Sequence, residues 1–278
     1  MSKAAAIQMC SSNNLEENLN IAAQLITEAA NNGATLAVLP EMFALMGLQL
    51  ADALSIKETY GSGKIQDFLA EQALRNNIWI VGGTIPIDNT KNKVGAACLV
   101  YNNKGLVVAR YDKVHLFDVI VSETESYRES AVMEPGDKLV VVDTPIGKLG
   151  LAVCYDLRFP TLFNYLLHQG AEIFAIPTAF TMTTGKAHWH LLTRSRAVEN
   201  LCYVIGACQY GTHASGRQTY GHSLMIEPWG SIIQELAEPR AGVIYADIDL
   251  TYLRKLRASL PIKEHQKILL DLSKLTMR

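Results

Sequence analysis

Short apolar runs alternate with amphipathic stretches along the first hundred residues. Apolar runs of roughly four to eight residues are typical of buried strands, and apolar positions three or four apart are typical of helices that cover a sheet. In chain order these patterns first predict a strand over residues 3–10 and a helix that opens with the capping pair Asn14 and Glu17 and ends at Asn32-Gly33. A strand over 35–40 and a helix after Gly61-Ser-Gly63 follow. The last predicted elements are strands over 78–84 and 96–101 and a hairpin through Asn102 and Gly105. The strand over 35–40 delivers Glu41 directly after its last residue.

Residues 150–160 carry a different signal. Apolar residues run up to Cys154, polar residues follow at once, and Pro160 is placed to open a helix that ends at Gly170. A strand, sharp turn and helix in this order hold the thiol out at the sheet edge, where backbone N–H groups can point at an oxygen that gains negative charge. Free cysteine is also a common buried hydrophobe, so the turn alone leaves a catalytic and a structural role open.

The pattern of the first half returns after this turn. Residues 33–40 align with 170–177, residues 77–82 with 200–206, and the hairpin around 102–105 has a counterpart within 224–234. Generic strand and helix units can resemble one another, but three matches in the same order favour two related halves. Two sheets that each carry helices on one side can bury their bare faces only against each other. We therefore expect an α/β fold, a four-layer α-β-β-α sandwich, over residues 1–250.

Residues 251–278 fall outside both halves and are expected to form a C-terminal arm. The helical pattern starts at Asp249, breaks near Leu260-Pro261 and resumes through the apolar positions Ile262, Ile268, Leu269, Leu272 and Leu275. The arm could pack on its own domain or on a partner subunit.

Composition narrows the class of partner. The 278 residues are 49% hydrophobic, enough for a sizeable core, and the net charge of −2 provides no field to attract nucleic acid or an anionic membrane. A small molecule is therefore the expected binding partner.

The five cysteines are odd in number and form no CxxC pair, which argues against a disulfide framework or a structural zinc site. No apolar run is long enough for a signal peptide or a membrane span, so we expect a cytoplasmic protein.

Three charged residues could act together with the thiol. Glu41, at a strand end, could be a general base that takes the thiol proton and later activates water. Lys113 would lower the pKa of a neighbouring thiol and stabilise a tetrahedral oxyanion. Glu129 could be a second carboxylate oriented toward the lysine. Each has a plainer alternative as a capping, solvated or surface ion-pair residue.

Four histidines raise the question of a metal site, but their spacing in the sequence does not support one. They are His188, His190, His213 and His222. His188 and His190 are two residues apart, so on a helix they would point to different sides. No cysteine or carboxylate spacing completes a metal motif, and no GxSxG turn supports a Ser-His-Asp triad.

These stretches together resemble the nitrilase superfamily of carbon–nitrogen hydrolases. The resemblance runs in family order through residues 39–41, 111–118, 128–130, 150–160, 179–180, 184–189, 194–199, 220–223 and 228–230. It implies the α-β-β-α fold, a hydrolase without metal or organic cofactor, and a homodimer or larger homo-oligomer. It also implies site roles: Cys154 as nucleophile, Glu41 as general base, Lys113 as oxyanion stabiliser, Glu129 as second glutamate, and the N–H of Tyr155 at the oxyanion.

The resemblance further suggests a substrate class. Arg158 could pair with a substrate carboxylate, although a structural ion pair with Asp156 or another acidic residue is an equal alternative. The chain is most similar to the branch that holds deaminated glutathione amidase and omega-amidase, which implies hydrolysis of a small α-keto acid amide. A catalytically silent relative that binds a metabolite or partner is the alternative of another class. The branch usually carries Glu where this chain has Thr161 and His190, and these departures bear on the substrate rather than on the chemistry.

Overall fold

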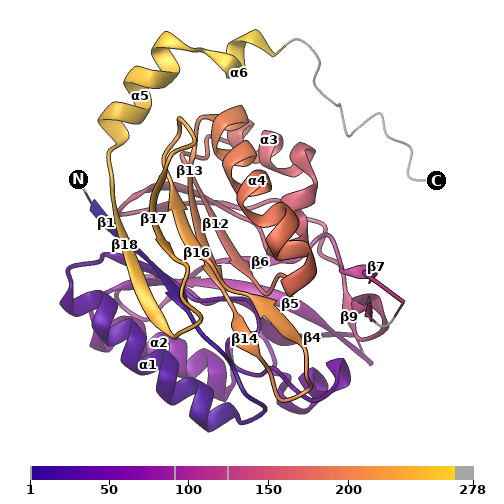
Figure 1. The fold of residues 1–278 in the computed structure, drawn as a ribbon. Coiled ribbons are helices and arrows are strands. Elements are labelled where there is room, and N and C mark those ends of the chain that lie inside the picture. Colours follow the sequence, from indigo (N-terminus) through magenta and orange to yellow (C-terminus); the bar gives the residue numbers. More distant parts are fainter. Residues whose placement is uncertain (1, 91, 124, 267–278) are drawn as a thin grey trace.

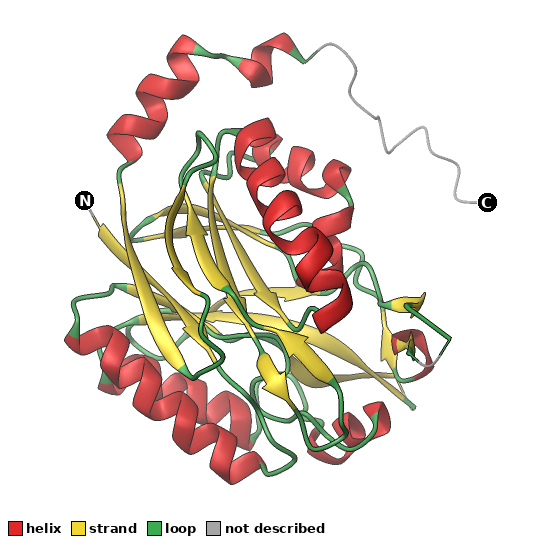
Figure 2. Cartoon of the chain, viewed as in Figure 1, coloured by secondary structure: helices red, strands yellow, loops and turns green. Residues whose placement is uncertain are grey.

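Two sheets lie face to face at the centre of the molecule, with helices on the two outer sides (Figures 1 and 2). The structure is a computed structural model that describes residues 2–90, 92–123 and 125–266. In the first half the elements are β1 (Ser2–Gln8), α1 (Leu15–Asn31), β2 (Leu36–Val38), the 3₁₀ helix η1 (Leu50–Ile56), α2 (Lys64–Arg75), β3 (Trp79–Val81), β4 (Ile85–Thr90), β5 (Lys93–Tyr101) and β6 (Val107–Asp112). A connecting region holds β7 (Asp118–Ile120), β8 (Ser126–Arg128), the 3₁₀ helix η2 (Glu129–Ala131) and β9 (Met133–Glu134).

The second half repeats the order of the first. Its elements are β10 (Val141–Thr144), β11 (Gly147–Leu151), the 3₁₀ helix η3 (Cys154–Arg158), α3 (Pro160–His168), β12 (Ile173–Thr178), α4 (Met182–Asn200), β13 (Tyr203–Cys208), β14 (Tyr210–Thr212), β15 (Gln218–Tyr220), β16 (Ser223–Ile226), β17 (Ile232–Leu236) and β18 (Gly242–Ile248). The strand, turn and helix around Cys154 form as predicted, with Pro160 at the first position of α3. The helix ends at His168, slightly before the predicted end.

The strand order shows how the halves correspond. The first sheet runs β18-β1-β2-β3-β5-β4, with β6 also on β5, and the second runs β10-β11-β12-β13-β16-β17. In each sheet three parallel strands, β1 to β3 or β11 to β13, have an antiparallel strand on either side. The hairpins β5–β6 and β16–β17 occupy equivalent places. The predicted sandwich of two related halves is confirmed.

Alternation along the strands explains why their sequences are apolar throughout. Ala4 and Ala6 of β1 face the core between the sheets, whereas Ala5 and Ile7 face the core under α1 and α2. All four side chains are fully buried. Because successive residues of a strand point to opposite faces, a strand covered on both faces needs apolar residues at every position.

The described part of the C-terminal arm contacts its own domain. Helix α5 (Leu250–Ser259) buries Leu253 completely, and Arg257 donates hydrogen bonds to the carbonyls of Leu201 and Ala171 at 3.0 and 2.9 Å. A break at Leu260-Pro261 precedes α6 (Ile262–His265), as predicted. Positions 268, 269, 272 and 275 lie outside the described residues, and packing of the arm on a partner subunit stays a prediction. Among the described helices, none is both long and apolar enough to span a membrane.

Candidate active site

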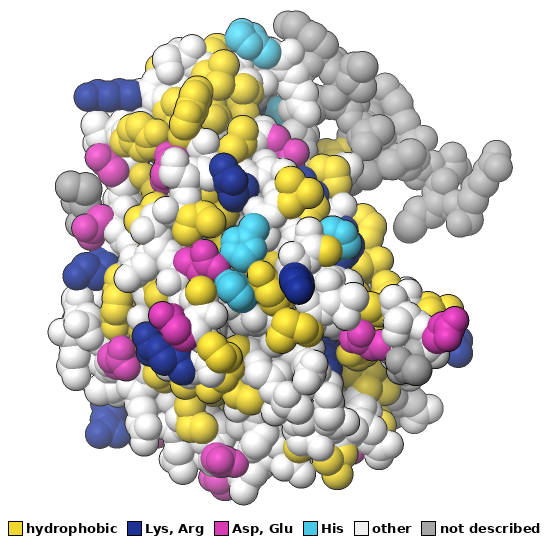
Figure 3. Space-filling model, in the orientation of Figure 1, with side chains coloured by type: hydrophobic (Ala, Val, Ile, Leu, Met, Phe, Trp, Pro, Cys, Tyr) yellow, Lys and Arg dark blue, Asp and Glu magenta, His cyan; other side chains and the backbone are white. Residues whose placement is uncertain are grey.

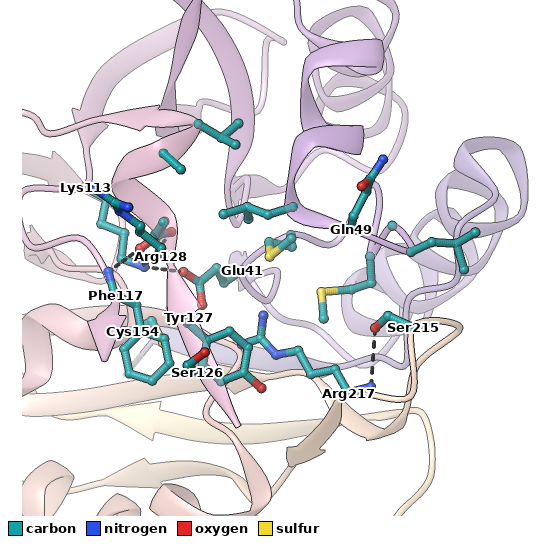
Figure 4. A pocket seen from close by; sticks show the side chains of 18 residues that line it. Glu41, Gln49, Lys113, Phe117, Ser126, Tyr127, Arg128, Cys154, Ser215 and Arg217 are labelled. Carbon is teal, nitrogen blue, oxygen red and sulfur yellow. Dashed lines mark hydrogen bonds and ion pairs between the residues drawn. The ribbon is translucent and has the colours of Figure 1, made fainter. Parts of the chain in front are cut away.

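Glu41 lies in a turn that both halves of the molecule hold in place. The turn follows β2, and Gly83 packs so closely against it that a Cβ at Gly83 would lie 2.1 Å from the carbonyl oxygen of Pro40. Gly83 also has a φ of +57°, which glycine adopts at little cost. From the second half, Nε2 of Gln209 donates to the carbonyl of Glu41 at 3.1 Å. The Glu41 side chain is buried and faces the space between the sheet ends (Figure 4).

Lys113 joins two carboxylates in a buried ion cluster. It follows β6 directly, and its Nζ donates to Oε1 of Glu41 at 2.8 Å and to the two carboxylate oxygens of Glu129 at 3.0 and 2.9 Å. Oε2 of Glu129 also accepts from the N–H of Phe117 at 2.6 Å. Burial by itself would lower the pKa of Lys113, but Glu129 and Glu41 outweigh burial and raise the pKa well above its ordinary value. The ammonium is therefore permanently charged and fixed.

Cys154 opens η3 in a backbone conformation that is rare for a side chain. Its φ is +46°, a left-handed value that costs a residue other than glycine roughly 1–3 kcal/mol. Burial raises the pKa of its thiol to about 12, and the Glu41 carboxylate adds to the rise. Lys113 acts in the opposite direction, as do Thr178 and the N–H of Ala179, but they do not compensate. Lys113 therefore lowers the pKa of the thiol, as expected, but burial and Glu41 outweigh it, so a base is needed to take the proton of Cys154.

Asp156 links the cysteine turn to the segment that carries Lys113. This carboxylate is fully buried and accepts hydrogen bonds from the hydroxyl of Tyr111 at 2.6 Å, the N–H of His115 at 3.0 Å and the N–H of Val153 at 2.8 Å. It also shares a 2.7 Å hydrogen bond with Nδ1 of His115. Tyr111 and His115 flank Lys113 by two residues on either side, so Asp156 fixes the lysine relative to the nucleophile.

These groups meet at a cavity of about 360 Å³. Glu41, Lys113, Glu129 and Cys154 all line it, so the structure brings together the four residues that the sequence singled out. One wall is apolar and consists of Met42, Met46, Leu48, Leu50 and Val132. Polar and cationic residues also line the cavity, among them Ser126, Tyr127, Arg128, Ser215 and Arg217, while Gln49 lies apart from these, between Leu48 and Leu50 in the chain (Figure 4). No sequence pattern predicted this second group, because β8 and the loop between β14 and β15 that supply it are far apart in the chain.

Arg217 is the best-placed cation for a substrate. Its guanidinium carbon lies 4.9 Å from the centre of the Tyr127 ring, and its Nη2 donates to the carbonyl of Ala179 at 2.7 Å. Its Nε is buried and makes no hydrogen bond with any residue that the structure describes. A buried donor without an acceptor is costly unless a ligand supplies one.

Of the two remaining predicted binding residues, Tyr155 directly follows Cys154, so its backbone N–H stays a candidate for the oxyanion, while Arg158 lies elsewhere. Tyr155 and Arg158 are absent from the described residues that line the cavity. The Tyr155 ring packs edge-on against Phe117 and Phe159. Arg158 lies 3.3 Å from Nδ1 of His188 and stacks over aromatic rings, while Asp156 is occupied by the partners named above. A substrate contact of Arg158 stays a prediction that the cavity does not support, and its ion pair with Asp156 is not formed.

The fold and the site together define a class of protein. A paired α/β sandwich holds a thiol, a carboxylate and an ammonium in one cavity, which is a combination suited to acyl transfer through a thioester. The sequence profile of the carbon–nitrogen hydrolase family matches residues 3–258. This chain belongs to the carbon–nitrogen hydrolase family, and the predicted nitrilase-superfamily resemblance is confirmed.

Individual relatives agree with this assignment. The chain is 38% identical to deaminated glutathione amidase of Yersinia enterocolitica, over 96% of this chain and 94% of that protein. It is 40% identical to nitrilase homolog 2 of Dictyostelium discoideum, over 95% of this chain and 80% of that protein. The crystal structure of Saccharomyces cerevisiae Nit3, a member of branch 10 of the nitrilase superfamily, superimposes with a TM-score of 0.86 and 32% identity, over 96% of this chain and 97% of that one.

Proposed function

We propose that this protein is an amidase that hydrolyses a small α-keto acid amide, with deaminated glutathione as the first candidate substrate. One observation carries the chemistry: the buried Glu41–Lys113–Glu129 cluster and Cys154 line the same cavity. Relatives named deaminated glutathione amidase support the substrate. A related amide, α-ketoglutaramate, is the second candidate because it shares the same acyl half.

The reaction runs through a thioester. Glu41 takes the proton of the neutral Cys154 thiol as the sulfur attacks the amide carbon, and Lys113 with the N–H of Tyr155 stabilises the oxyanion. The tetrahedral intermediate collapses by breaking the carbon–nitrogen bond, and the leaving amine takes the proton from Glu41. Water then attacks the thioester, Glu41 takes one of its protons, and the returning thiol is reprotonated. The products are the free acid and the amine, and Glu129 keeps the ammonium of Lys113 in place throughout.

The cationic side of the cavity fits the acyl half. Both candidate substrates carry a carboxylate at the end opposite the scissile bond, and Arg217 is one of the residues that line the cavity. A guanidinium forms paired hydrogen bonds with a carboxylate. Arg217, rather than Arg158, is therefore our candidate for recognition of the substrate acid.

Two further expectations belong to this proposal. We propose a homodimer or larger assembly, supported by exposed apolar side chains of Leu191 and Val198 on α4 and of Trp229 beside it in the β16–β17 turn. We also propose a cytoplasmic location, supported by the free state of all five cysteines.

The deciding experiment measures release of 2-oxoglutarate by the purified protein from deaminated glutathione and, separately, from α-ketoglutaramate. Both substrates give this product, so one coupled assay compares the two kcat/KM values. Preference for deaminated glutathione supports the first candidate, and the reverse preference supports the second. Cys154→Ala should lose activity by about three orders of magnitude or more. Activity on neither substrate, or full activity of that variant, would refute the proposal.

A matched pair of variants tests recognition separately from chemistry. Arg217→Gln should raise KM for the keto acid amide by about tenfold or more while amides without a carboxylate are cleaved as before. Arg158→Gln, outside the cavity, should leave KM unchanged. A higher KM for Arg158→Gln, with an unchanged KM for Arg217→Gln, would instead indicate that Arg158 binds the substrate carboxylate.

A further inference from the structure

Two histidines and a glutamate converge on the outer side of the second sheet. His190 comes from α4, His222 precedes β16 and Glu235 lies on β17, so three separate elements supply them. Nε2 of His190 and Nδ1 of His222 lie 2.8 and 2.5 Å from Oε1 of Glu235. The three ligand atoms all lie within 4.8 Å of one another. The chain spacing concealed this group, because Glu235 is far from both histidines in sequence.

The two imidazoles are held by their surroundings. The Tyr220 ring stacks on His222 at 4.1 Å and contacts His190 edge-on at 6.0 Å. Nε1 of Trp189, which is fully buried, donates to the carbonyl of His222 at 2.8 Å. The rings are therefore oriented before any ligand arrives, which lowers the entropy that binding would cost.

The chemistry of the three side chains suits one kind of ligand. Two imidazole nitrogens and one carboxylate oxygen form a common three-residue ligand set for Zn²⁺, with a fourth position left for water. A tetrahedral zinc ion places neighbouring ligand atoms about 3.3 Å apart, which small side-chain rotations would reach from the present separations.

The group is open to solvent on one side. The side chains of His190, His222 and Glu235 are 33%, 23% and 23% exposed. Figure 3 shows histidine and acidic side chains meeting near the middle of the visible face, where an ion could enter directly. None of the three lines the cavity around Cys154.

We propose that His190, His222 and Glu235 form a zinc-binding site that ties α4 to the β16–β17 hairpin. Each ring then binds the metal through the nitrogen that now faces Glu235, and the ring proton resides on its other nitrogen. The ion replaces the hydrogen bonds to Glu235 with coordinate bonds. Because it joins a helix to the sheet beneath it, its first effect is on stability and not on the amidase reaction.

The test is a titration of the chelator-treated full-length protein with Zn²⁺, followed by calorimetry, and a parallel titration with Co²⁺, followed by its visible absorption. We expect one ion per chain and a Tm rise of about 5 °C at a hundredfold excess of zinc over Kd. Amidase activity serves only as a check that each variant folds.

Four variants separate this site from other sources of binding. His190→Gln keeps a donor toward Glu235 but removes the metal ligand, and Glu235→Gln removes the charge; each should weaken zinc binding at least about tenfold. His188→Gln is the matched control, because His188 is exposed on the same helix and outside the group. Cys10→Ser tests the half-exposed thiol, whose sulfur lies 3.9 Å from Nδ1 of His213.

The expected pattern is loss of binding in the first two variants and retention in the other two. Absence of binding by the parent protein would overturn the proposal. Equal binding by all four variants, or loss only in Cys10→Ser, would also overturn it, since the ion would then be held elsewhere.

Discussion

β2 and β12 occupy the same place in the two sheets, yet the residues that follow them differ. β2 leads into Pro40 and Glu41, whereas β12 ends at Thr178 and continues into Ala179. In the same way β11 leads to Cys154, while its counterpart β1 leads to Met9 and Cys10. The scaffold is duplicated but the chemistry is not. Each half supplies a different part of one site.

The second half also holds reactive segments of the first half in place. Gln209 of the second half holds the carbonyl of Glu41, and Asp156 of the second half anchors the segment around Lys113. Burying the charges of Glu41, Lys113 and Glu129 costs solvation free energy. Hydrogen bonds among these three side chains, which separate elements supply, offset that cost. We therefore expect that substitutions in the ion cluster, or in the residues of one half that hold the other, change both the activity and the stability of the protein.

The largest effect is expected from Lys113→Met. Removal of the ammonium leaves two buried carboxylates close together, which should cost about 3–5 kcal/mol of unfolding free energy and lower kcat by about a thousandfold. Lys148→Met is the matched control, because Lys148 makes an exposed ion pair with Asp143 in the other half. Urea unfolding should show a loss below about 1 kcal/mol for that control. Similar losses of unfolding free energy in the two variants would show that the buried ion cluster contributes no more to stability than an exposed ion pair.

A smaller effect is expected from Asp156→Asn. The amide keeps the shape of the carboxylate but cannot accept from all of its donors, so the turn and the Lys113 segment should separate slightly. We expect kcat to fall about 10- to 100-fold with little change in KM, and about 2 kcal/mol of stability to be lost. Asp143→Asn, which changes an exposed carboxylate, provides the comparison. A change in KM alone would argue against a positioning role.

The smallest effect is a difference in pH dependence. The folded protein keeps the Cys154 proton up to about pH 12, whereas the unfolded chain releases it near the ordinary thiol value. The raised pKa stabilises the fold below that ordinary value, and this contribution is lost as pH rises toward 12. Urea unfolding should therefore show a steeper loss above about pH 9 for the parent than for Cys154→Ala, by at most about 1.4 kcal/mol per pH unit. Parallel curves would mean that the thiol is not buried as described.

Strand patterns in the sequence were enough to predict the two halves and two of the site residues. Cys154 and Glu41 were found because each follows an apolar run, and such runs reveal strand ends. Lys113 and Glu129 have no such local signal, and only the resemblance to the family favoured them over a solvated lysine and a surface ion pair. Their meeting depends on the β5–β6 hairpin and on η2, which place the two within hydrogen-bond reach.

Other features could not be predicted because they depend on packing between distant segments. Arg217 reaches the cavity from a loop that the pattern does not place, and Glu235 meets His190 across 45 residues. The net rise in the pKa of Cys154 could not be predicted for a related reason. A sequence indicates which charges are near, but not how much burial opposes them.

The neutral state of Cys154 has a consequence for the lifetime of the enzyme. Peroxide and other oxidants react with thiolates, so a protonated, buried sulfur is a poor target between turnovers. The nucleophile becomes reactive only while substrate fills the cavity and Glu41 accepts the proton, and the substrate itself then shields the sulfur. An enzyme built in this way should withstand oxidative stress that inactivates proteins with a permanently ionised cysteine.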